Sequence, residues 1–361
     1  MRVLHYVEHW LDLSAGFVHA HVSRSAHRPV VVSHNAIENR ATFPQRPIVR
    51  LDPFARRIPP HRWSRDRTRL LQIVAAGYRT RIVHVHFGFV VGDVLDAVRR
   101  RDLPLVLSLH GSDATSLPQR QPGHYDEARE LVSAVIVPSQ FLAGVARELG
   151  FPADRIHVIP AGIDTTFFTP SPLPEHPTVT FVGRLVEKKG LDVLMEAWPT
   201  VCAAVADARL VLVGAGPLAS AIPADDPSVR HLTPQAARRG DQVRDAIRDA
   251  RVVVSPSRTA VSGDAESLLL VNLEAQASGR PVVTTRHGGI PEFVAENASA
   301  LIVPEGDAPA LADALVRVLT DRPLAQRLAQ AGPAVAARFD VRDCVRRVDE
   351  VYEALRPLRR P

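Results

Sequence analysis

Two carboxylates, Glu266 and Glu274, stand eight residues apart in a stretch that suits work on a phosphate-bearing substrate. We expect Glu266 in a loop and Glu274 about one turn into a helix that opens near Leu268 to Leu270. The start of a helix carries about half a positive charge and free N–H donors, so the amides around Leu269 and Leu270 suit a diphosphate. The two glutamates would then accept hydrogen bonds from sugar hydroxyls. Two solvent-facing glutamates are the alternative interpretation of the same spacing.

The only two lysines of the chain, Lys188 and Lys189, are neighbours, whereas 42 of the 44 basic side chains are arginine. They lie with Arg184 in the loop Gly183 to Gly190, which follows the apolar run Thr178 to Val182, an expected strand. Arginine offers a planar fork for phosphate oxygens, and lysine a compact charge. The loop therefore places cations where a parallel sheet binds ligands, at the carboxyl ends of its strands. A solvated loop before a helix is the alternative.

Histidines at three places in the sequence are candidates for function. His110 follows an expected strand end and precedes a glycine, which favours a functional role. His84 and His86 alternate on a strand, and for these two a structural role is favoured. His287 precedes two glycines in a loop, and the pattern leaves its role open.

The segment Gly214-Ala215-Gly216-Pro217 follows a strand, as the glycines of a dinucleotide-binding motif do. Pro217, however, stands where the phosphate-binding helix should continue, so we interpret the segment as a tight turn. Asp113 and Asp164 are interpreted as turn or cap residues.

These positions lie on a chain in which short apolar runs alternate with stretches of helical period, which indicates an α/β fold with parallel sheets. In the first half the expected strands are Arg2 to Val7, Pro29 to Ser33, Ile82 to His86, Pro104 to Leu109, Ala134 to Pro138 and Ile156 to Pro160. In the second half they are Thr178 to Val182, Arg209 to Val213, Arg251 to Val254, Pro281 to Thr284 and Ala300 to Val303. Four prolines between positions 170 and 177 predict an extended linker. Beyond Val303 the chain is expected to be helical to its end, over Ala308 to Thr320 with Asp307 as a helix cap, then Pro323 to Ala331 and Val341 to Leu355.

A length of 361 residues exceeds what one hydrophobic core usually supports, so we expect two domains, at 1–165 and 166–339. No apolar run is long enough to span a membrane, and the start of the chain is unlike a secretory signal, which predicts a cytoplasmic protein. The net charge is +5, and an arginine-rich stretch at 54–81 is a candidate for peripheral contact with the inner membrane face or with an acidic acceptor. Eleven arginines and two aspartates lie between Arg40 and Arg81 without the aromatic interleaving of nucleic-acid-binding proteins, so no nucleic-acid partner is expected. A solvated helix face is the favoured alternative for these arginines.

The order and spacing of these motifs resemble those of the retaining glycosyltransferases of family 4. The run FVGRLVEKKG, then VLVGAGP, SPS, the two glutamates, EAQASGRPVV and GGIPE carry the resemblance over residues 134–361, and HVHFG, HGSD and VPSQFLA carry it more loosely in the first half. The resemblance implies a GT-B fold, in which two Rossmann-like, doubly wound domains face a central cleft. It implies an acceptor-binding domain at 1–165, to which a last helix at about 340–361 returns, and a donor-binding domain at 166–339. A nucleotide sugar is the implied co-substrate, without a metal or another cofactor.

The resemblance also assigns the residues that would hold the donor diphosphate. Arg184 and Lys189 are similar to the pair that binds it and stabilises the charge that grows on the leaving group. Backbone amides at Leu269 and Leu270 would contact phosphate. Gly16, which remains from a glycine-rich loop, would let the backbone of the first domain approach it.

Three further side chains match residues of the family that contact the sugar nucleotide. Glu274 matches the glutamate that binds the ribose, and Glu266 matches the catalytic glutamate that faces the transferred sugar. His110 resembles the catalytic histidine of the first domain near that sugar. Retention of configuration would follow from front-face attack, with the departing phosphate taking the acceptor proton.

The implied reaction moves a hexose from a UDP-sugar, or another nucleotide sugar, to a hydroxyl of a saccharide, a lipid-linked intermediate or a small natural product. The sequence 267–269, Ser-Leu-Leu, stands where the family has glycines, and 229–233 lacks the family's aromatic-glycine turn at the base, so sugar and base stay open. The first change also raises the alternative of a nucleotide-sugar-binding partner without turnover. A UDP-N-acetylglucosamine epimerase is a further alternative, which the EKKG loop and the glutamate spacing disfavour.

Overall fold

The computed structural model describes residues 1–12, 15–51, 60–233 and 239–355. It divides into two compact units: an N-terminal unit, Met1–Ala161 with Val341–Pro361, and a C-terminal unit, Gly162–Asp340. The end of the chain thus belongs to the same unit as its beginning, and the division falls after Ala161, close to the expected boundary at 165. Residues 54–59 of the arginine-rich stretch and 356–361 of the expected last helix lie outside the described residues.

The N-terminal unit contains a seven-stranded parallel sheet in the order β3-β2-β1-β4-β5-β6-β7. Its strands are β1 (Arg2–Val7), β2 (Arg28–Ser33), β3 (Ile48–Arg50), β4 (Ile82–His86), β5 (Leu105–Ser108), β6 (Val132–Val137) and β7 (Ile156–Val158). The central strands are continuous apolar runs because parallel sheets are covered on both faces. The sequence did not predict β3, whose three residues are too few to show a period.

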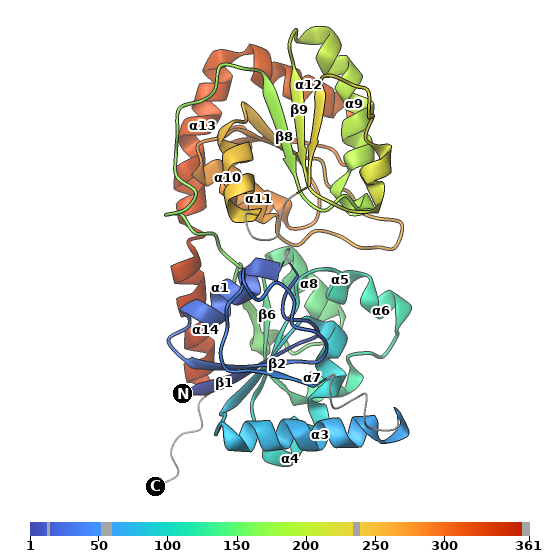
Figure 1. The fold of residues 1–361 in the computed structure, drawn as a ribbon, viewed down its shortest axis with the longest axis vertical. Coiled ribbons are helices and arrows are strands. Elements are labelled where there is room, and N and C mark those ends of the chain that lie inside the picture. The colour runs from blue at the N-terminus through green and yellow to red at the C-terminus, as the bar shows by residue number, and fades with distance from the viewer. Residues whose placement is uncertain (13–14, 52–59, 234–238, 356–361) are drawn as a thin grey trace. The chain divides into compact units, whose positions relative to one another are not determined.

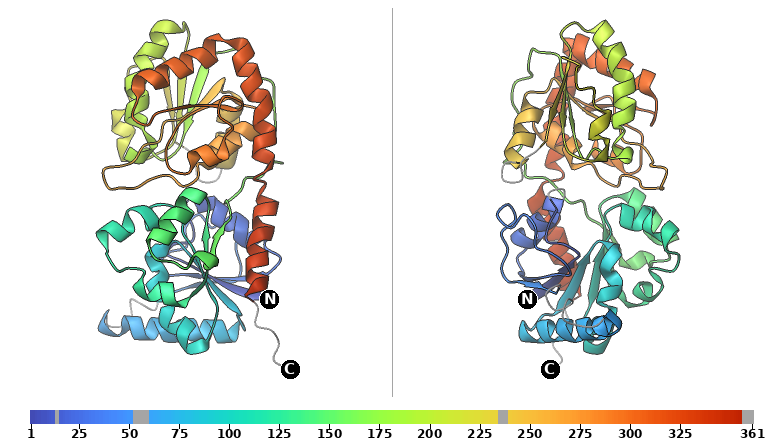
Figure 2. Two further views of the ribbon diagram at one scale, coloured as in Figure 1. Left: turned by 180° about the vertical axis from the view of Figure 1, so that it is seen from behind. Right: turned by 45° about the vertical axis from the view of Figure 1, so that its right-hand side comes forward.

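Helices cover both faces of this sheet. They are α1 (Gly16–Arg24), α3 (Pro60–Gly77), α4 (Leu95–Arg101), α5 (Ser112–Thr115), α6 (Leu117–Arg120), α7 (Asp126–Leu131), α8 (Gln140–Glu148) and α14 (Val341–Ala354), with a 3₁₀ turn, η2, at Gly88–Asp93. Because side chains alternate along a strand, Val3 and Ile82 pack against Val348 of α14, whereas Leu4 and Val83 pack beneath α3 and α4. Helices α1 and α14, from opposite ends of the chain, lie side by side (Figure 1), and Figure 2 shows α14 from behind against this sheet.

The C-terminal unit repeats this architecture with a six-stranded parallel sheet in the order β10-β9-β8-β11-β12-β13. Its strands are β8 (Thr178–Val182), β9 (Arg209–Val213), β10 (Val229–Leu232), β11 (Val252–Ser255), β12 (Val282–Thr285) and β13 (Ala300–Val303). Its helices are α9 (Leu191–Ala204), α10 (Arg239–Arg248), α11 (Leu270–Ala277), α12 (Ala308–Thr320) and α13 (Arg322–Ala337). Helices α9 and α12 pack together on one face (Figure 1), and α10 and α11 pack on the other.

Local chemistry accounts for several element ends in this unit. Asp307 caps α12 as predicted, because its carboxylate accepts the Ala310 N–H at 2.9 Å. Helix α13 runs six residues past the predicted end at Ala331 and contains Pro333. Close packing accompanies this continuation, since a Cβ at Gly332 would lie only 2.7 Å from the carbonyl oxygen of Gln276 in α11. No helix among the described residues is long and apolar enough to cross a membrane.

Both sheets have the strand order of a doubly wound nucleotide-binding fold. The order reverses between β1 and β4 in the N-terminal unit and between β8 and β11 in the C-terminal unit. Ligands of such sheets bind beyond the carboxyl ends of the strands at these reversals. The loops after β8 and β11 are therefore where a site of the C-terminal unit is expected.

Candidate functional site

The lysine-containing loop leaves the carboxyl end of β8, at the reversal of the C-terminal sheet. Arg184 is exposed, and within the described part of the chain it has no ion-pair partner. Lys188 and Lys189 lie in the following 3₁₀ turn, η4 (Glu187–Lys189), and Lys188 is buried. The guanidinium of Arg184 is thus available to an anion at this edge of the sheet.

Glycines fix the path of this loop. Gly190 ends η4 with φ at +67°, and a Cβ there would lie 1.8 Å from the carbonyl oxygen of Pro256, just beyond β11. A Cβ at Gly214, after β9, would lie 1.9 Å from the carbonyl oxygen of Gly183. The turn at 214–217 thus packs directly against the lysine-containing loop at 183–190. The Leu185 N–H of that loop donates to the carbonyl oxygen of Ala215 at 2.8 Å. These glycines let three chain segments meet at the site.

The loop after β11 brings Glu266 to the two lysines. The ammonium of Lys189 lies 2.7 Å from Oε1 of Glu266, and that of Lys188 lies 3.7 Å from the same oxygen. Lys188 also donates to Oδ1 of Asp264 at 3.1 Å. The side chains of Lys189 and Glu266 are only 16% and 7% exposed. The structure therefore joins a residue expected at the diphosphate with the glutamate expected at the sugar, and it adds Asp264, which the sequence analysis did not identify.

The charges of this cluster shift one another's titration. Burial raises the pKa of Glu266, but Lys189 and Lys188 outweigh this effect, so its pKa lies below the usual value and Glu266 is a carboxylate at neutral pH. Burial lowers the pKa of Lys189, and the charges of Lys188 and Arg184 lower it further. The carboxylate of Glu266 opposes this shift. Three cations and two carboxylates leave an excess of positive charge, which an anionic ligand would neutralise.

The start of α11 lies in the same segment. The helix begins at Leu270, and its N-cap residue, Leu269, contributes no capping side chain, so no side chain of the cap competes for the first amides of the helix. Glu274 follows one turn later and is half-buried. Asn272 accepts a hydrogen bond from the Ser255 hydroxyl at 2.7 Å, which ties the helix start to the end of β11.

In the N-terminal unit, His110 and Gly16 lie near the carboxyl ends of β5 and β1. The ring of Phe17, next to Gly16, lies 4.9 Å from the ring of His110 between centroids. A Cβ at Gly16 would lie 3.3 Å from Cε1 of Phe43, so close packing also favours glycine there. Burial, with a smaller effect of His21, lowers the pKa of His110 to about 3, so its imidazole is neutral at physiological pH.

Asp113 fixes the backbone at His110. Its fully buried carboxylate accepts N–H hydrogen bonds from Gly88, His110 and Gly111 at 2.9, 2.9 and 2.8 Å. Burial raises the pKa of Asp113 although these three amides oppose the shift. The residue predicted as a turn or cap residue therefore joins the ends of β4 and β5 and holds the loop that carries His110.

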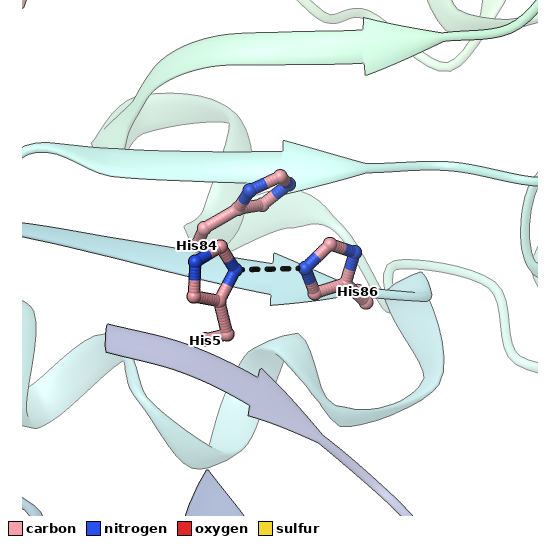
Figure 3. A group of neighbouring side chains, drawn as sticks. All are labelled: His5, His84 and His86. Carbon is pink, nitrogen blue, oxygen red and sulfur yellow. Dashed lines mark hydrogen bonds between the residues drawn. The ribbon is translucent and has the colours of Figure 1, made fainter. Parts of the chain in front are cut away.

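Three buried histidines, His5, His84 and His86, form a cluster on β1 and β4 whose ligand atoms lie within 4.8 Å of one another. Figure 3 shows the hydrogen bond of 3.1 Å between Nδ1 of His5 and Nε2 of His86. Both nitrogens of His84 contact protein groups, the Tyr352 hydroxyl at 2.5 Å and the Ser108 hydroxyl at 2.7 Å. Burial lowers the pKa of all three, so they are neutral. Neutral imidazoles could ligate a metal, but these contacts support the structural role predicted for His84 and His86.

The sheets define a protein with two Rossmann-like domains, the second of which carries a cationic cluster at its strand-order reversal. Two family models match the chain: Glycosyltransferase Family 4 over residues 15–167 and Glycosyl transferases group 1 over residues 176–321. The D-inositol 3-phosphate glycosyltransferase of Xylanimonas cellulosilytica is 31% identical over 314 residues, which cover 75% of this chain and 71% of the relative. The chain belongs to glycosyltransferase family 4.

A further relative is the GDP-mannose-dependent alpha-(1-6)-phosphatidylinositol monomannoside mannosyltransferase of Mycobacterium tuberculosis. It is 36% identical over 196 residues, 50% of this chain and 51% of the relative. The chain thus spans about half the length of the first curated relatives it matches. Among solved structures, HepE of Anabaena in complex with UDP and glucose matches with a TM-score of 0.79 at 18% identity, covering 98% of this chain and 100% of HepE. This likeness supports the GT-B fold expected from the sequence.

Proposed function

We propose that the chain is a retaining, metal-independent glycosyltransferase that moves a hexose from a nucleoside-diphosphate sugar to an acceptor hydroxyl. The observation that carries this proposal is the pairing of Lys188 and Lys189 with the buried carboxylate of Glu266, in the same loop after β8 as the exposed Arg184. Cations at a strand-order reversal suit a diphosphate, and the ionised glutamate beside them suits the hydroxyls of the attached sugar.

The chemistry of transfer follows from this charge arrangement. The bond between the anomeric carbon and the β-phosphate oxygen breaks, and a bond from the acceptor oxygen to that carbon forms on the same face. Arg184, Lys189 and the amides at Leu269 and Leu270 neutralise the charge that grows on the departing diphosphate, which takes up the acceptor proton. Glu274 binds the ribose. No general acid is needed, which agrees with the lowered pKa of Glu266.

The donor is proposed to be a UDP-sugar, with GDP-mannose as its main competitor. HepE was solved with UDP and glucose, whereas the mycobacterial relative is named as GDP-mannose-dependent. The segment 229–233, where the family places the base, contains the edge strand β10 (Val229–Leu232) in this chain. Its sequence, Val-Arg-His-Leu-Thr, contains no Phe, Tyr or Trp on which a base could stack, so the nucleotide has to be measured.

The acceptor is proposed to be a saccharide or lipid-linked hydroxyl that the N-terminal unit binds, with a small natural product as the remaining class. The relatives include a phosphatidylinositol monomannoside mannosyltransferase and a putative colanic acid biosynthesis glycosyltransferase of Escherichia coli. His110, neutral and held by Asp113, would contact the transferred sugar as a hydrogen-bonding partner without charge. Gly16 would let the backbone approach the donor phosphate from the N-terminal unit. We propose a cytoplasmic location for the reaction.

Thermal shift with UDP, GDP, ADP and TDP tests the donor site first. A ligand present at 100 times its dissociation constant stabilises the native state by about 2.7 kcal/mol, which is readily detected. We expect one nucleotide to respond and Arg184→Ala and Lys189→Met each to reduce the stabilisation to about half or less. The matching nucleotide sugars are then offered with a panel of saccharide and lipid-linked acceptors, and release of the nucleoside diphosphate is measured. Binding without release under every condition would favour a nucleotide-sugar-binding protein instead.

A further inference from the structure

The backbone of Glu266 is held from the loop that follows β12. The Glu266 N–H donates to Nε2 of His287 at 3.0 Å, and the Gly289 N–H donates to the carbonyl oxygen of Glu266 at 3.0 Å. His287 is only 4% exposed. Both peptide groups that flank the Glu266 side chain are therefore fixed by one short segment, His-Gly-Gly at 287–289.

The hydrogen-bonding state of His287 follows from its partners. A backbone amide only donates, so Nε2 must accept, and the ring hydrogen is on Nδ1. Nδ1 donates to Oε2 of Glu305 at 2.5 Å. The same carboxylate oxygen accepts the Thr259 N–H at 3.1 Å. Glu305 and His287 thus join the segments that follow β11, β12 and β13.

These contacts matter because the segment that carries Glu266 has no other regular support. Between β11 and α11 the chain runs from Pro256 to Leu269 without helix or strand. The direction of the Glu266 side chain therefore depends on the hydrogen bonds of its own peptide groups as well as on its ion pair with Lys189. A displacement of about 1 Å at a reacting centre is enough to cost about 100-fold in rate.

We propose that His287 is a positioning residue: by accepting the Glu266 N–H it aims the Glu266 carboxylate at Lys189 and at the transferred sugar, a role that rests on the transferase function proposed above. His287 itself touches neither Lys189 nor a phosphate-binding amide in these contacts. Its substitution should therefore impair transfer while binding of the nucleoside diphosphate, which rests on Arg184 and Lys189, is retained.

A matched pair of substitutions separates this role from simple packing. In His287→Gln the amide oxygen reaches the place of Nε2 and still accepts the Glu266 N–H, whereas the contact with Glu305 is lost. In His287→Asn the amide nitrogen takes the place of Nδ1 and still donates to Glu305, whereas the acceptor for Glu266 is lost. Both variants remove the imidazole. If His287 served only in packing, the two variants would therefore lose amide protection and kcat to the same extent.

The experiment measures three quantities in the full chain and both variants: hydrogen exchange of the Glu266 amide by NMR, the dissociation constants of UDP and GDP by calorimetry, and kcat for the best donor and acceptor. We expect His287→Asn to lose protection of the Glu266 amide and to lower kcat by up to about 100-fold, with nucleotide affinity unchanged within about threefold. His287→Gln should keep the protection and most of kcat. Equal losses in both variants, or wild-type values in His287→Asn, would overturn the proposal.

A failure of the transferase function has a different signature. If the wild type releases no sugar from any donor, the proposed function is wrong, but the exchange rate of the Glu266 amide still decides whether His287 fixes that backbone. Should His287→Asn be too unstable to study, Glu305→Gln provides a second variant. It keeps an acceptor for Nδ1–H but removes the negative charge, and we expect the Glu266 amide to stay protected and kcat to fall less than tenfold. Loss of that protection would contradict the geometry.

Discussion

Replacement of Lys189 by methionine tests how the cationic cluster combines stability with function. The methionine keeps most of the apolar stem and removes only the ammonium that lies 2.7 Å from Glu266. The Glu266 carboxylate, whose side chain is 7% exposed, would then have, of the residues that the structure describes, only Lys188 as an ion-pair partner, at 3.7 Å. Lys188 is already hydrogen-bonded to Asp264. Removal of one partner from a buried ion pair costs about 3–5 kcal/mol. Because Lys188 stays nearby, we expect a smaller loss than this, about 2–3 kcal/mol.

A double-mutant cycle with Glu266→Gln isolates this cost. The neutral amide of glutamine needs no counter-charge, so Lys189→Met should be much less harmful in the Glu266→Gln background, with a coupling energy of about 2 kcal/mol. Because the two units need not unfold together, stability should be followed locally, through the denaturant dependence of hydrogen exchange in β8 and β11. Peptides of β1 and β4 in the N-terminal unit provide the internal control.

The same cycle distinguishes binding from folding. The double variant should recover stability but should still fail to bind the nucleoside diphosphate, because the ammonium is gone. Additive stability losses, with no coupling between the two substitutions, would show that the pair at 2.7 Å is not energetically linked and would refute the reasoning. Nucleotide affinity that survives in the double variant would refute the assignment of Lys189.

Four further outcomes are expected. Arg184→Ala should weaken nucleoside-diphosphate binding by about 10- to 100-fold in calorimetry without changing the unfolding temperature, because this exposed guanidinium has no ion-pair partner in the described residues. Gly190→Ala should destabilise β8 in hydrogen exchange by about 2 kcal/mol or more, since φ is +67° and the new Cβ would meet a carbonyl oxygen at 1.8 Å; an unchanged exchange rate would contradict the close packing. The pKa values of His5 and His110 are about 3 in the folded state against 6.5 ordinarily, so the unfolded N-terminal unit binds more protons and its stability should fall as pH decreases from 6.5, by at most about 1.4 kcal/mol per pH unit for each histidine. Hydrogen exchange at pH 5 should therefore show that β1 opens more readily than β8. Equal opening of the two strands would contradict neutral, buried imidazoles. Binding of the protein to anionic vesicles at low salt would support a membrane contact of the arginine-rich stretch at 54–81. We expect Ile73→Asp to abolish this binding, because Ile73 is 66% exposed on α3. No binding at any salt concentration would exclude the contact.

Much of the fold was predictable because its strands are continuous apolar runs. The parallel α/β pattern, the cap at Asp307 and the placement of the helix start near Leu270 were all read from periodicity and capping chemistry. Short or polar elements were missed, since β3 has three residues and β10, Val229–Leu232, is half polar. The end of α13 was also predicted too early, at Ala331, because close packing against α11 supports a helix that continues through Pro333.

The site was predictable in its residue types but not in its contacts. Local spacing placed Arg184, Lys189 and Glu266 near one sheet edge, yet the pairing of Lys189 with Glu266 depends on two loops that are 77 residues apart and meet only through the fold. The link from Glu305 through His287 to the Glu266 amide likewise joins three loops. Such links leave no periodic signal in a single sequence, which is why His287 stayed open.

The affinity of the C-terminal unit for a nucleoside diphosphate relative to its monophosphate tests the central claim most directly. Calorimetry on the full chain, with the nucleotide that responds in the thermal shift screen, should show at least about tenfold tighter binding of the diphosphate, since the β-phosphate is the group that Arg184 and Lys189 are proposed to hold. Arg184→Ala and Lys189→Met should each remove that preference. Equal affinity for both nucleotides, or a preference that survives both substitutions, would contradict the account.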